Sequence, residues 1–334
     1  MRSFRTAVLG AATLASLAAR PAEAQPQAQQ PQGFAVERLY PSAPGAGWFV
    51  MDTLDMHGGL GGVMGMTVGY ARDPLRLRTT DGAQRLTVVS DESLVGFGIG
   101  ATYDRFRLYI NLDMPLDVAG DGGTIGAYQF AAPNSNQPFT PSGVNPSTTP
   151  DALADGRIGF DARIYGEAGG PLRLGASAQL FIPSPNTFDS EYLSDGTFRA
   201  MGRALFAGDV GLVTYAGQLG VHVRPRDDSP TPGGPQGSEL LFGVAAGPRL
   251  PLAGGRALVV GPEVYGATAF RSLFGSAATA LEGLLSARVE GTAESGGQLR
   301  VRLGIGAGLH PRFGAPEWRM VVGVELFDHH QDNR

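Results

Sequence analysis

Residues 299–310 read "LRVRLGIGAGLH", and their alternation separates two classes of fold. Leu299, Val301, Leu303 and the later odd positions are apolar, whereas the residues between them are arginine or glycine. Alternation with period 2 indicates a β-strand with one apolar face. A soluble β-sandwich would bury the leucines, whereas a membrane barrel would turn the leucines to lipid and the arginines to its lumen.

The N-terminus has the three parts of an export signal. Arg2 and Arg5 form a basic region, "TAVLGAATLASLAA" follows as a run of small and apolar residues, and Ala22-Glu23-Ala24 provides an A-x-A cleavage site. We therefore predict a signal peptide over residues 1–24, followed by a polar linker and N-terminal segment over 25–47. The apolar run is shorter than the roughly 20 residues of a spanning helix, and no later stretch is long enough either.

Composition excludes several classes of function. The 334 residues carry a net charge of −5, and all 26 basic residues are arginine, so we expect no nucleic-acid partner. Cysteine is absent, which excludes disulfides, a thiol nucleophile and a thiolate metal site. Clusters with the spacing of a metal site are also missing from the sequence, and we expect no metal and no cofactor.

The alternation seen at 299–310 recurs along nearly the whole chain. Counting that segment, we predict twelve strands, over residues 63–70, 94–103, 105–116, 157–167, 171–182, 198–206, 212–223, 239–250, 257–266, 281–291, 299–310 and 318–327. Most are about 10 to 12 residues long, close to the length with which a tilted strand crosses a bilayer.

The connections between these segments alternate between long and short. Long ones at 72–91, 118–154, 184–196 and 225–237 are followed by short ones at 103–105, 168–171, 208–211 and 252–255. The last three, at 268–279, 292–297 and 311–316, are less clear-cut. Long outer loops and short periplasmic turns are typical of outer-membrane barrels, and an even strand count places both termini in the periplasm.

We therefore predict an all-β fold, an up-and-down antiparallel transmembrane β-barrel of about 12 strands over residues 48–328, with a periplasmic tail over 329–334. Its expected location is the bacterial outer membrane. The alternative is a secreted sandwich or solenoid, although no repeat of fixed length supports a solenoid.

The polar face of the predicted strands is strongly charged. Twelve arginines share it: Arg107, Arg157, Arg163, Arg173, Arg199, Arg203, Arg224, Arg249, Arg288, Arg300, Arg302 and Arg319. Eight acids accompany them: Asp113, Asp161, Glu167, Glu239, Glu263, Glu282, Glu290 and Glu325. Arginine at the lipid midplane costs about 2–4 kcal/mol, so these residues are expected in the lumen. They could pair into a salt-bridged plug or line a pore that favours anions.

Other residues on the predicted strands have less specific interpretations. Inward glycines at 96, 98, 100, 304, 306 and 308 are expected to leave room for long arginine side chains. Aromatic residues near strand ends suit interfacial girdles: Trp48, Phe49, Tyr70, Tyr103, Phe106, Phe181, Phe198, Phe206, Trp318 and Phe327. His222 lies on an inward position beside a long loop, but no catalytic partner pattern accompanies it. We expect no enzymatic activity.

Three stretches carry a family resemblance: "FAVERLYPSAPGAGWFVMDTLDM" (34–56), "DGRIGFDARIYGE" (155–167) and "WRMVVGVELFDHH" (318–330). They resemble the N-terminal barrel of OmpA-family outer-membrane proteins of myxobacterial type. That resemblance implies a membrane barrel, usually followed by calcium-binding repeats and a peptidoglycan-binding domain. The chain ends at "DHHQDNR", about where those would begin, so we expect the peptidoglycan-binding domain to be absent.

Two functions remain open from the sequence. One is a small passive pore or transporter for small solutes with a mild anion preference. The other is a non-conducting structural or surface-display barrel of OmpA type. Expected partners are outer-membrane lipid and lipopolysaccharide, small solutes, and the barrel-assembly machinery, because "VVGVELF" (321–327) approximates the glycine-then-aromatic ending of an assembly signal.

Overall fold

The chain forms a closed antiparallel barrel in a computed structural model that describes residues 35–56, 58–79, 81–125, 128–130, 132–133, 154–183, 192–195, 197–225, 237–291, 297–310 and 314–329. The barrel strands are β1 (Leu60–Arg78), β2 (Arg85–Tyr103), β3 (Phe106–Ala119), β6 (Gly156–Tyr165), β7 (Arg173–Ile182), β8 (Arg199–Val210), β9 (Val213–Val223), β10 (Glu239–Pro251), β11 (Ala257–Ala269), β12 (Thr279–Glu290), β13 (Gly297–His310) and β14 (Trp318–His329). All twelve strands predicted from the alternation are present.

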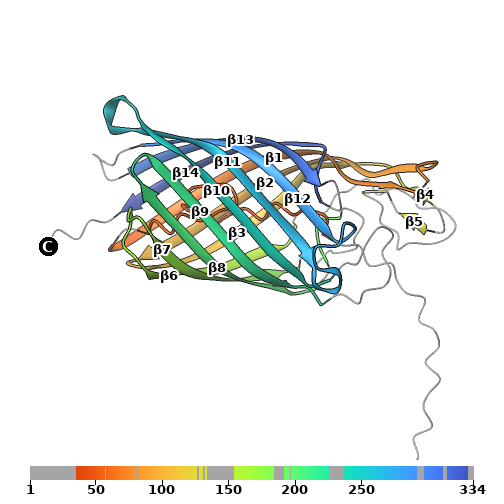
Figure 1. The fold of residues 1–334 in the computed structure, drawn as a ribbon, viewed down its shortest axis with the longest axis horizontal. Coiled ribbons are helices and arrows are strands. Elements are labelled where there is room, and N and C mark those ends of the chain that lie inside the picture. Colours follow the sequence, from red (N-terminus) through yellow and green to blue (C-terminus); the bar gives the residue numbers. More distant parts are fainter. Residues whose placement is uncertain are drawn as a thin grey trace, which may run out of the picture. The chain divides into compact units, whose positions relative to one another are not determined.

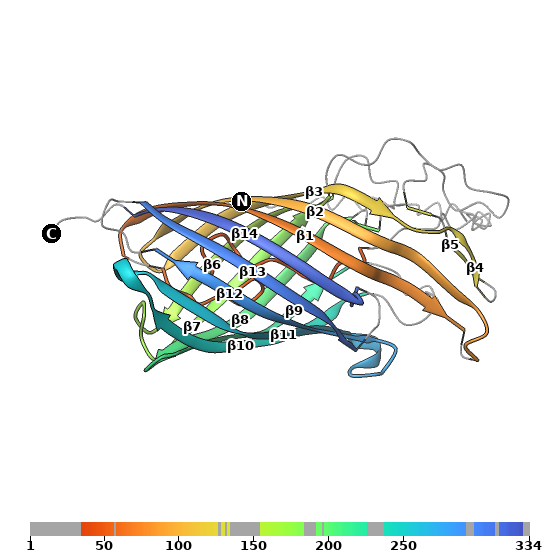
Figure 2. The ribbon, with the colours of Figure 1, turned by 90° about the horizontal axis from the view of Figure 1, so that it is seen from above.

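The sheet has up-and-down connectivity (Figure 1, Figure 2). Each barrel strand pairs with the next along the chain, and β1 closes the barrel against β14 over a register from Gly61↔His329 to Arg72↔Trp318. The short strands β4 (Gly123–Ile125) and β5 (Tyr128–Phe130) form a separate hairpin between β3 and β6. The predicted fold class is therefore confirmed.

The stretch predicted as a long connection at 72–91 is mostly strand. β1 and β2 continue past the barrel wall as a paired ribbon, visible at the right of Figure 1, and turn at Gly82 with a φ of 73°. Irregular register between Arg72 and Arg76 interrupts the ladder there. Because a bulge changes which face each side chain takes, period-2 alternation is lost at this point of the sequence.

The connections follow from the antiparallel order. Successive connections alternate between the two ends of the barrel. The tight turn at Gly211, which has a φ of 60°, joins β8 to β9. This turn lies at the same end of the barrel as the last residue of β14. Most residues of the long connections at 118–154, 184–196 and 225–237 lie outside the described part of the chain, as does the predicted signal peptide. Among the described residues, no helix is long and apolar enough to cross a membrane.

Candidate functional site: a barrel lumen filled by the N-terminal segment

The two faces of the barrel wall differ as the opening stretch predicts. In β13, Leu303 and Ile305 are 52% and 57% exposed on the outside, whereas Arg302 is 5% exposed. In β7, buried and exposed residues alternate along all ten positions, with Arg173 buried and Leu174 exposed. The apolar residues therefore face the surroundings and the arginines face the lumen.

The structure brings most of the predicted lumen residues together. The buried ones are Arg107, Arg157, Asp161, Arg163, Arg173, Arg199, Arg203, Arg224, Glu239, Glu263, Glu282, Arg288, Arg302, Arg319 and Glu325, while Asp113, Glu290 and Arg300 are partly buried. Arg249 keeps a side chain that is 48% exposed at the end of β10.

Glu167 was wrongly assigned to the lumen. It lies after the end of β6, its side chain is 80% exposed, and it contacts Arg105 at the barrel rim. Glu92 of β2 takes its place as an acid of the lumen, because it is only 1% exposed. Glu92 is not among the predicted lumen residues because it lies beside the ribbon, where the apolar alternation stops.

The lumen holds a segment of the same chain. Residues 35–56, here called the plug, precede β1; most of them are buried and the others are partly buried. The plug folds on itself, since Ser42 N donates to Phe49 O at 2.8 Å and Thr53 N donates to Ala46 O at 2.8 Å. The predicted boundary of the barrel at residue 48 is therefore too early, because the first wall strand begins at Leu60.

Carboxylates of the wall accept hydrogen bonds from the plug backbone. Glu263 accepts from Phe49 N at 3.0 Å and from Val50 N at 2.9 Å, and Glu325 accepts from Gly45 N at 3.1 Å. A buried backbone N–H without a partner would destabilise the fold. The wall acids thus take the place of the neighbouring strand that the plug lacks.

Arginines of the wall donate to the plug carbonyls in the same way. Arg302 donates to Trp48 O at 2.9 Å, and Arg157 donates to Pro41 O at 2.9 Å. Arg163 reaches two carbonyls, those of Leu54 at 3.1 Å and Met56 at 2.8 Å. Hydrogen bonds from a charged group are stronger than neutral ones, so these contacts fix the path of the plug.

Four ion-pair groups also join the plug to the wall. In one, Arg107 lies between Asp52 of the plug at 2.7 Å and Asp161 at 3.4 Å. Each group places a plug residue with an arginine and an acid of the wall: Asp52 with Arg107 and Asp161, Glu37 with Arg319 and Glu282, Arg38 with Arg224 and Glu239, and Asp55 with Arg173 and Asp209.

Glycines of the wall match apolar residues of the plug. A Cβ on Gly98 would come within 2.5 Å of Pro44, and one on Gly243 within 2.3 Å of Met51. The closely matched pairs are Gly98 with Pro44, Gly175 with Leu54, Gly243 with Met51 and Gly304 with Phe49. Of the inward glycines that we expected to accommodate arginines, Gly98 and Gly304 make room for the plug instead.

A smaller part of the lumen charge is paired within the wall alone. Arg203 donates to Gln218 at 2.9 Å and to Ser177 at 3.0 Å, whereas Arg173 contacts both Asp209 of the wall at 2.7 Å and Asp55 of the plug at 3.9 Å. Both of these hydrogen-bond partners of Arg203 lie on strands β7 and β9 rather than on the plug. This arginine is therefore a useful reference for the plug contacts.

The aromatic girdle was only partly predicted. Tyr103, Phe106, Phe198, Phe206 and Trp318 are exposed near strand ends, as expected for the girdle. Four other members were wrong, because Trp48, Phe49, Phe181 and Phe327 are buried inside the barrel. Their sequence positions near strand ends could not show whether the ring points out or in.

His222 lies in the interior rather than at the rim. Its ring is fully buried and packs edge-on against Tyr40 of the plug, with ring centroids 5.1 Å apart. On Phe181 of the wall it packs at the same separation with the two ring planes inclined by 31°. Among the described residues, no group of three or more histidine and acidic side chains is arranged to hold a metal ion.

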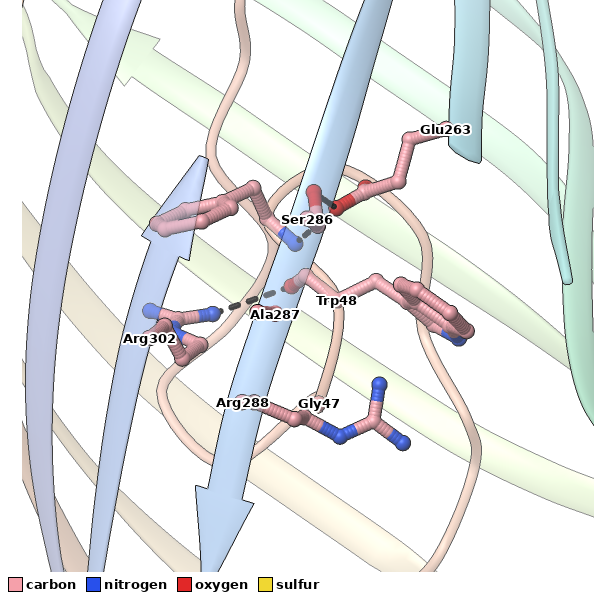
Figure 3. A pocket seen from close by; sticks show the side chains of 8 residues that line it. Gly47, Trp48, Glu263, Ser286, Ala287, Arg288 and Arg302 are labelled. Atoms are coloured by element: carbon pink, nitrogen blue, oxygen red, sulfur yellow. Dashed lines mark hydrogen bonds between the residues drawn. The ribbon is translucent and has the colours of Figure 1, made fainter. Parts of the chain in front are cut away.

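Cavities remain where the plug meets the wall. One has no room for a water molecule and is lined by Gly47, Trp48, Phe49, Glu263, Ser286, Ala287, Arg288 and Arg302, and Figure 3 shows Arg288 extended toward the Trp48 ring. A second, with a volume of about 30 Å³, lies beside Pro44, Asp55, Arg107 and Arg300, near the start of β1. The plug therefore fills the space between these strands with small gaps.

Comparison with known proteins supports the fold. No family model and no curated protein matches the chain. The COG4313 outer membrane channel from Pseudomonas putida F1 is similar in structure, with 12% identity, a TM-score of 0.50, and coverage of 82% of this chain and 96% of that one. The CymD monoaromatic hydrocarbon channel has 9% identity and a TM-score of 0.42 over 84% of this chain and 91% of that one. The first similarity, with the closed twelve-strand sheet, shows the fold of an outer-membrane barrel.

Proposed function

We propose that the protein is a gated outer-membrane channel for small solutes, closed by the plug and favouring anions when the plug is displaced. The observation that carries this proposal is the kind of contact that holds the plug. Wall arginines and acids bind its backbone and its charged side chains, and such polar contacts can be exchanged for contacts with water. A segment needed only to fill the barrel could be held by apolar packing.

The charge balance supports the anion preference. The plug carries three acids, Glu37, Asp52 and Asp55, and one arginine, Arg38, so its net charge is −2. Its displacement leaves Arg107 and Arg319 of the wall without one of their carboxylates. Unpaired cations in a narrow lumen raise the local anion concentration, because wall charge is weakly screened within about 8–10 Å.

The alternative is a non-conducting structural or display barrel. The plug's close fit, with glycines of the wall matched to its apolar side chains, favours this second function. It predicts that the plug never leaves the lumen under conditions in which the barrel stays folded.

Planar-bilayer recording of the purified protein tests the proposal. We expect brief openings that become more frequent in low concentrations of urea, and a reversal potential in a KCl gradient with the sign of anion selectivity. Replacing Arg300 and Arg302 together by Gln should move the reversal potential toward cations and lengthen the openings, because Arg302 also holds Trp48 O. Folded protein that gives no openings would overturn the proposal in favour of the display barrel.

A further inference from the structure

Arginines crowd one part of the lumen wall. The arginine cluster, defined as Arg249, Arg288, Arg300 and Arg302, lies on β10, β12 and β13. Glu290 is shared by three of its members, with distances of 2.7 Å to Arg288, 3.2 Å to Arg249 and 3.5 Å to Arg300. One carboxylate therefore serves three guanidinium groups.

Two members of the arginine cluster stand directly opposite each other. Arg288 and Arg302 are register partners across β12 and β13, and each is 5% exposed. Like charges in opposite positions of an antiparallel pair destabilise a sheet. Glu325 compensates Arg302 and Arg300 at 3.0 Å each, so two carboxylates contact the four guanidinium groups.

The plug stabilises these two arginines with aromatic faces and one oxygen. The Trp48 ring centroid lies 4.6 Å from Arg288 Cζ, and the Phe49 ring centroid lies 4.8 Å from Arg302 Cζ. Arg302 also donates to Trp48 O, as the dashed line in Figure 3 shows. Cations stack favourably on aromatic faces when both are removed from water.

Three nitrogen donors where the plug meets the arginine cluster have no hydrogen-bond acceptor in the described part of the chain. Arg288 Nη1, Arg302 Nε and Trp48 Nε1 are buried and have no hydrogen-bond partner among the described residues. When the plug is displaced, Glu263 loses its hydrogen bonds from Phe49 N and Val50 N. Its negative charge is then available to the arginine cluster, together with those of Glu290 and Glu325. Four guanidinium groups then face three carboxylates, which leaves one positive charge.

We propose that the arginine cluster is a binding site in the opened lumen for aromatic carboxylates. This inference rests on the proposed function and adds its substrate class. The solute's ring would replace the Trp48 ring over Arg288, and its carboxylate would take the place of Trp48 O beside Arg302. A planar guanidinium can both stack on a ring and bind a carboxylate in this way.

Benzoate and cyclohexanecarboxylate separate ring stacking from charge. Both are monoanions with a six-membered ring, but cyclohexanecarboxylate has no aromatic face. With the full chain in a planar bilayer, we expect benzoate to interrupt the open-channel current at a concentration about tenfold lower than cyclohexanecarboxylate. A tenfold difference corresponds to about 1.4 kcal/mol. Benzamide, which is aromatic but neutral, should interrupt the current at neither concentration.

Substitutions in the arginine cluster provide the structural control. Arg288→Gln should abolish the difference between benzoate and cyclohexanecarboxylate, and Arg288→Lys, which keeps the charge but not the planar group, should reduce it. Arg203→Gln is the matched control, because Arg203 contacts Gln218 and Ser177 of the wall and should leave the difference unchanged. A gel-mobility shift on heating verifies that each variant is folded.

The outcomes distinguish this inference from the proposed function. A channel that opens but responds equally to benzoate and cyclohexanecarboxylate would overturn the aromatic-carboxylate site and leave the gated channel standing. The same holds if Arg203→Gln removes the preference as fully as Arg288→Gln does. Folded wild-type protein without any openings would instead overturn the proposed function, and the inference with it.

Discussion

Glu263 is the wall residue whose removal should release the plug most directly. Its two carboxylate oxygens accept from Phe49 N at 3.0 Å and Val50 N at 2.9 Å, and Ser286 Oγ donates to it at 2.6 Å. The Ser286 bond lies within the wall and survives any movement of the plug. Only the two backbone bonds therefore count toward docking of the plug.

The expected effect of Glu263→Gln follows from those two bonds. A hydrogen bond to a charged group contributes about 1.5–3 kcal/mol, and a neutral one about 1 kcal/mol. Glutamine has one acceptor oxygen, and its NH₂ group faces the second N–H donor. The plug thus loses two charged bonds and regains one neutral bond, a net loss of about 3 kcal/mol. Since about 1.4 kcal/mol is a factor of ten, the ratio of open to closed channels should rise about 100-fold.

Single-channel recording at fixed voltage measures this ratio. Glu317→Gln is the matched control, because Glu317 is exposed near the end of the barrel, contacts Arg76 at 3.5 Å, and should not change the ratio. If Glu263→Gln opens no more often than the wild-type protein while its barrel remains folded, the carboxylate does not hold the plug and the reasoning is refuted.

Two further predictions address the lumen charge and the orientation of the barrel. Glu92 is buried without a hydrogen-bond partner among the described residues, whereas the neighbouring Arg319 is bound by Glu37. Because an unpaired buried carboxylate destabilises the fold, Glu92→Gln should raise the free energy of unfolding in urea by about 1–3 kcal/mol. An unchanged or lower free energy of unfolding would contradict this. Proteases added to intact cells should cleave within 118–154 and spare 168–171, as mapped by mass spectrometry of the fragments; cleavage confined to 168–171 would invert the orientation.

The wall of the barrel could be predicted because lipid imposes a simple pattern. Every strand that crosses the membrane must turn apolar side chains outward and polar ones inward, and this pattern is local in the sequence. Leu303 and Arg302 show it within two residues. The twelve strands and the inward positions of their arginines follow from the same rule.

The plug could not be predicted because its contacts are not local. Phe49 and Val50 are bound by Glu263, more than 200 residues away in the chain. The plug has no periodicity, since the wall side chains rather than a neighbouring strand satisfy its backbone. The apolar run Trp48–Met51, placed before the first alternating strand, is the one sequence signal that could have suggested a buried segment.

Two residues near the rim of the barrel were wrongly predicted for a related reason. Beyond the membrane, both faces of a strand can be polar or both apolar, so alternation no longer shows where a strand ends. Glu167 was therefore placed inside when it lies in a turn, and Glu92 was missed although it lies inside. The resemblance to OmpA-family barrels stays a prediction.

A disulfide between the plug and the wall tests the central claim, that movement of the plug opens the channel. The chain contains no cysteine, and a Cβ built on Gly65 of β1 lies 3.9 Å from Pro44 Cβ of the plug, which suits a disulfide. The variant with Pro44→Cys and Gly65→Cys can be recorded oxidised and then reduced in the same bilayer, with each single substitution as a control. We predict that the oxidised double variant stays closed and that a reductant restores openings, whereas the single variants do not respond. Equal conductance of the oxidised and reduced double variant would contradict gating by the plug.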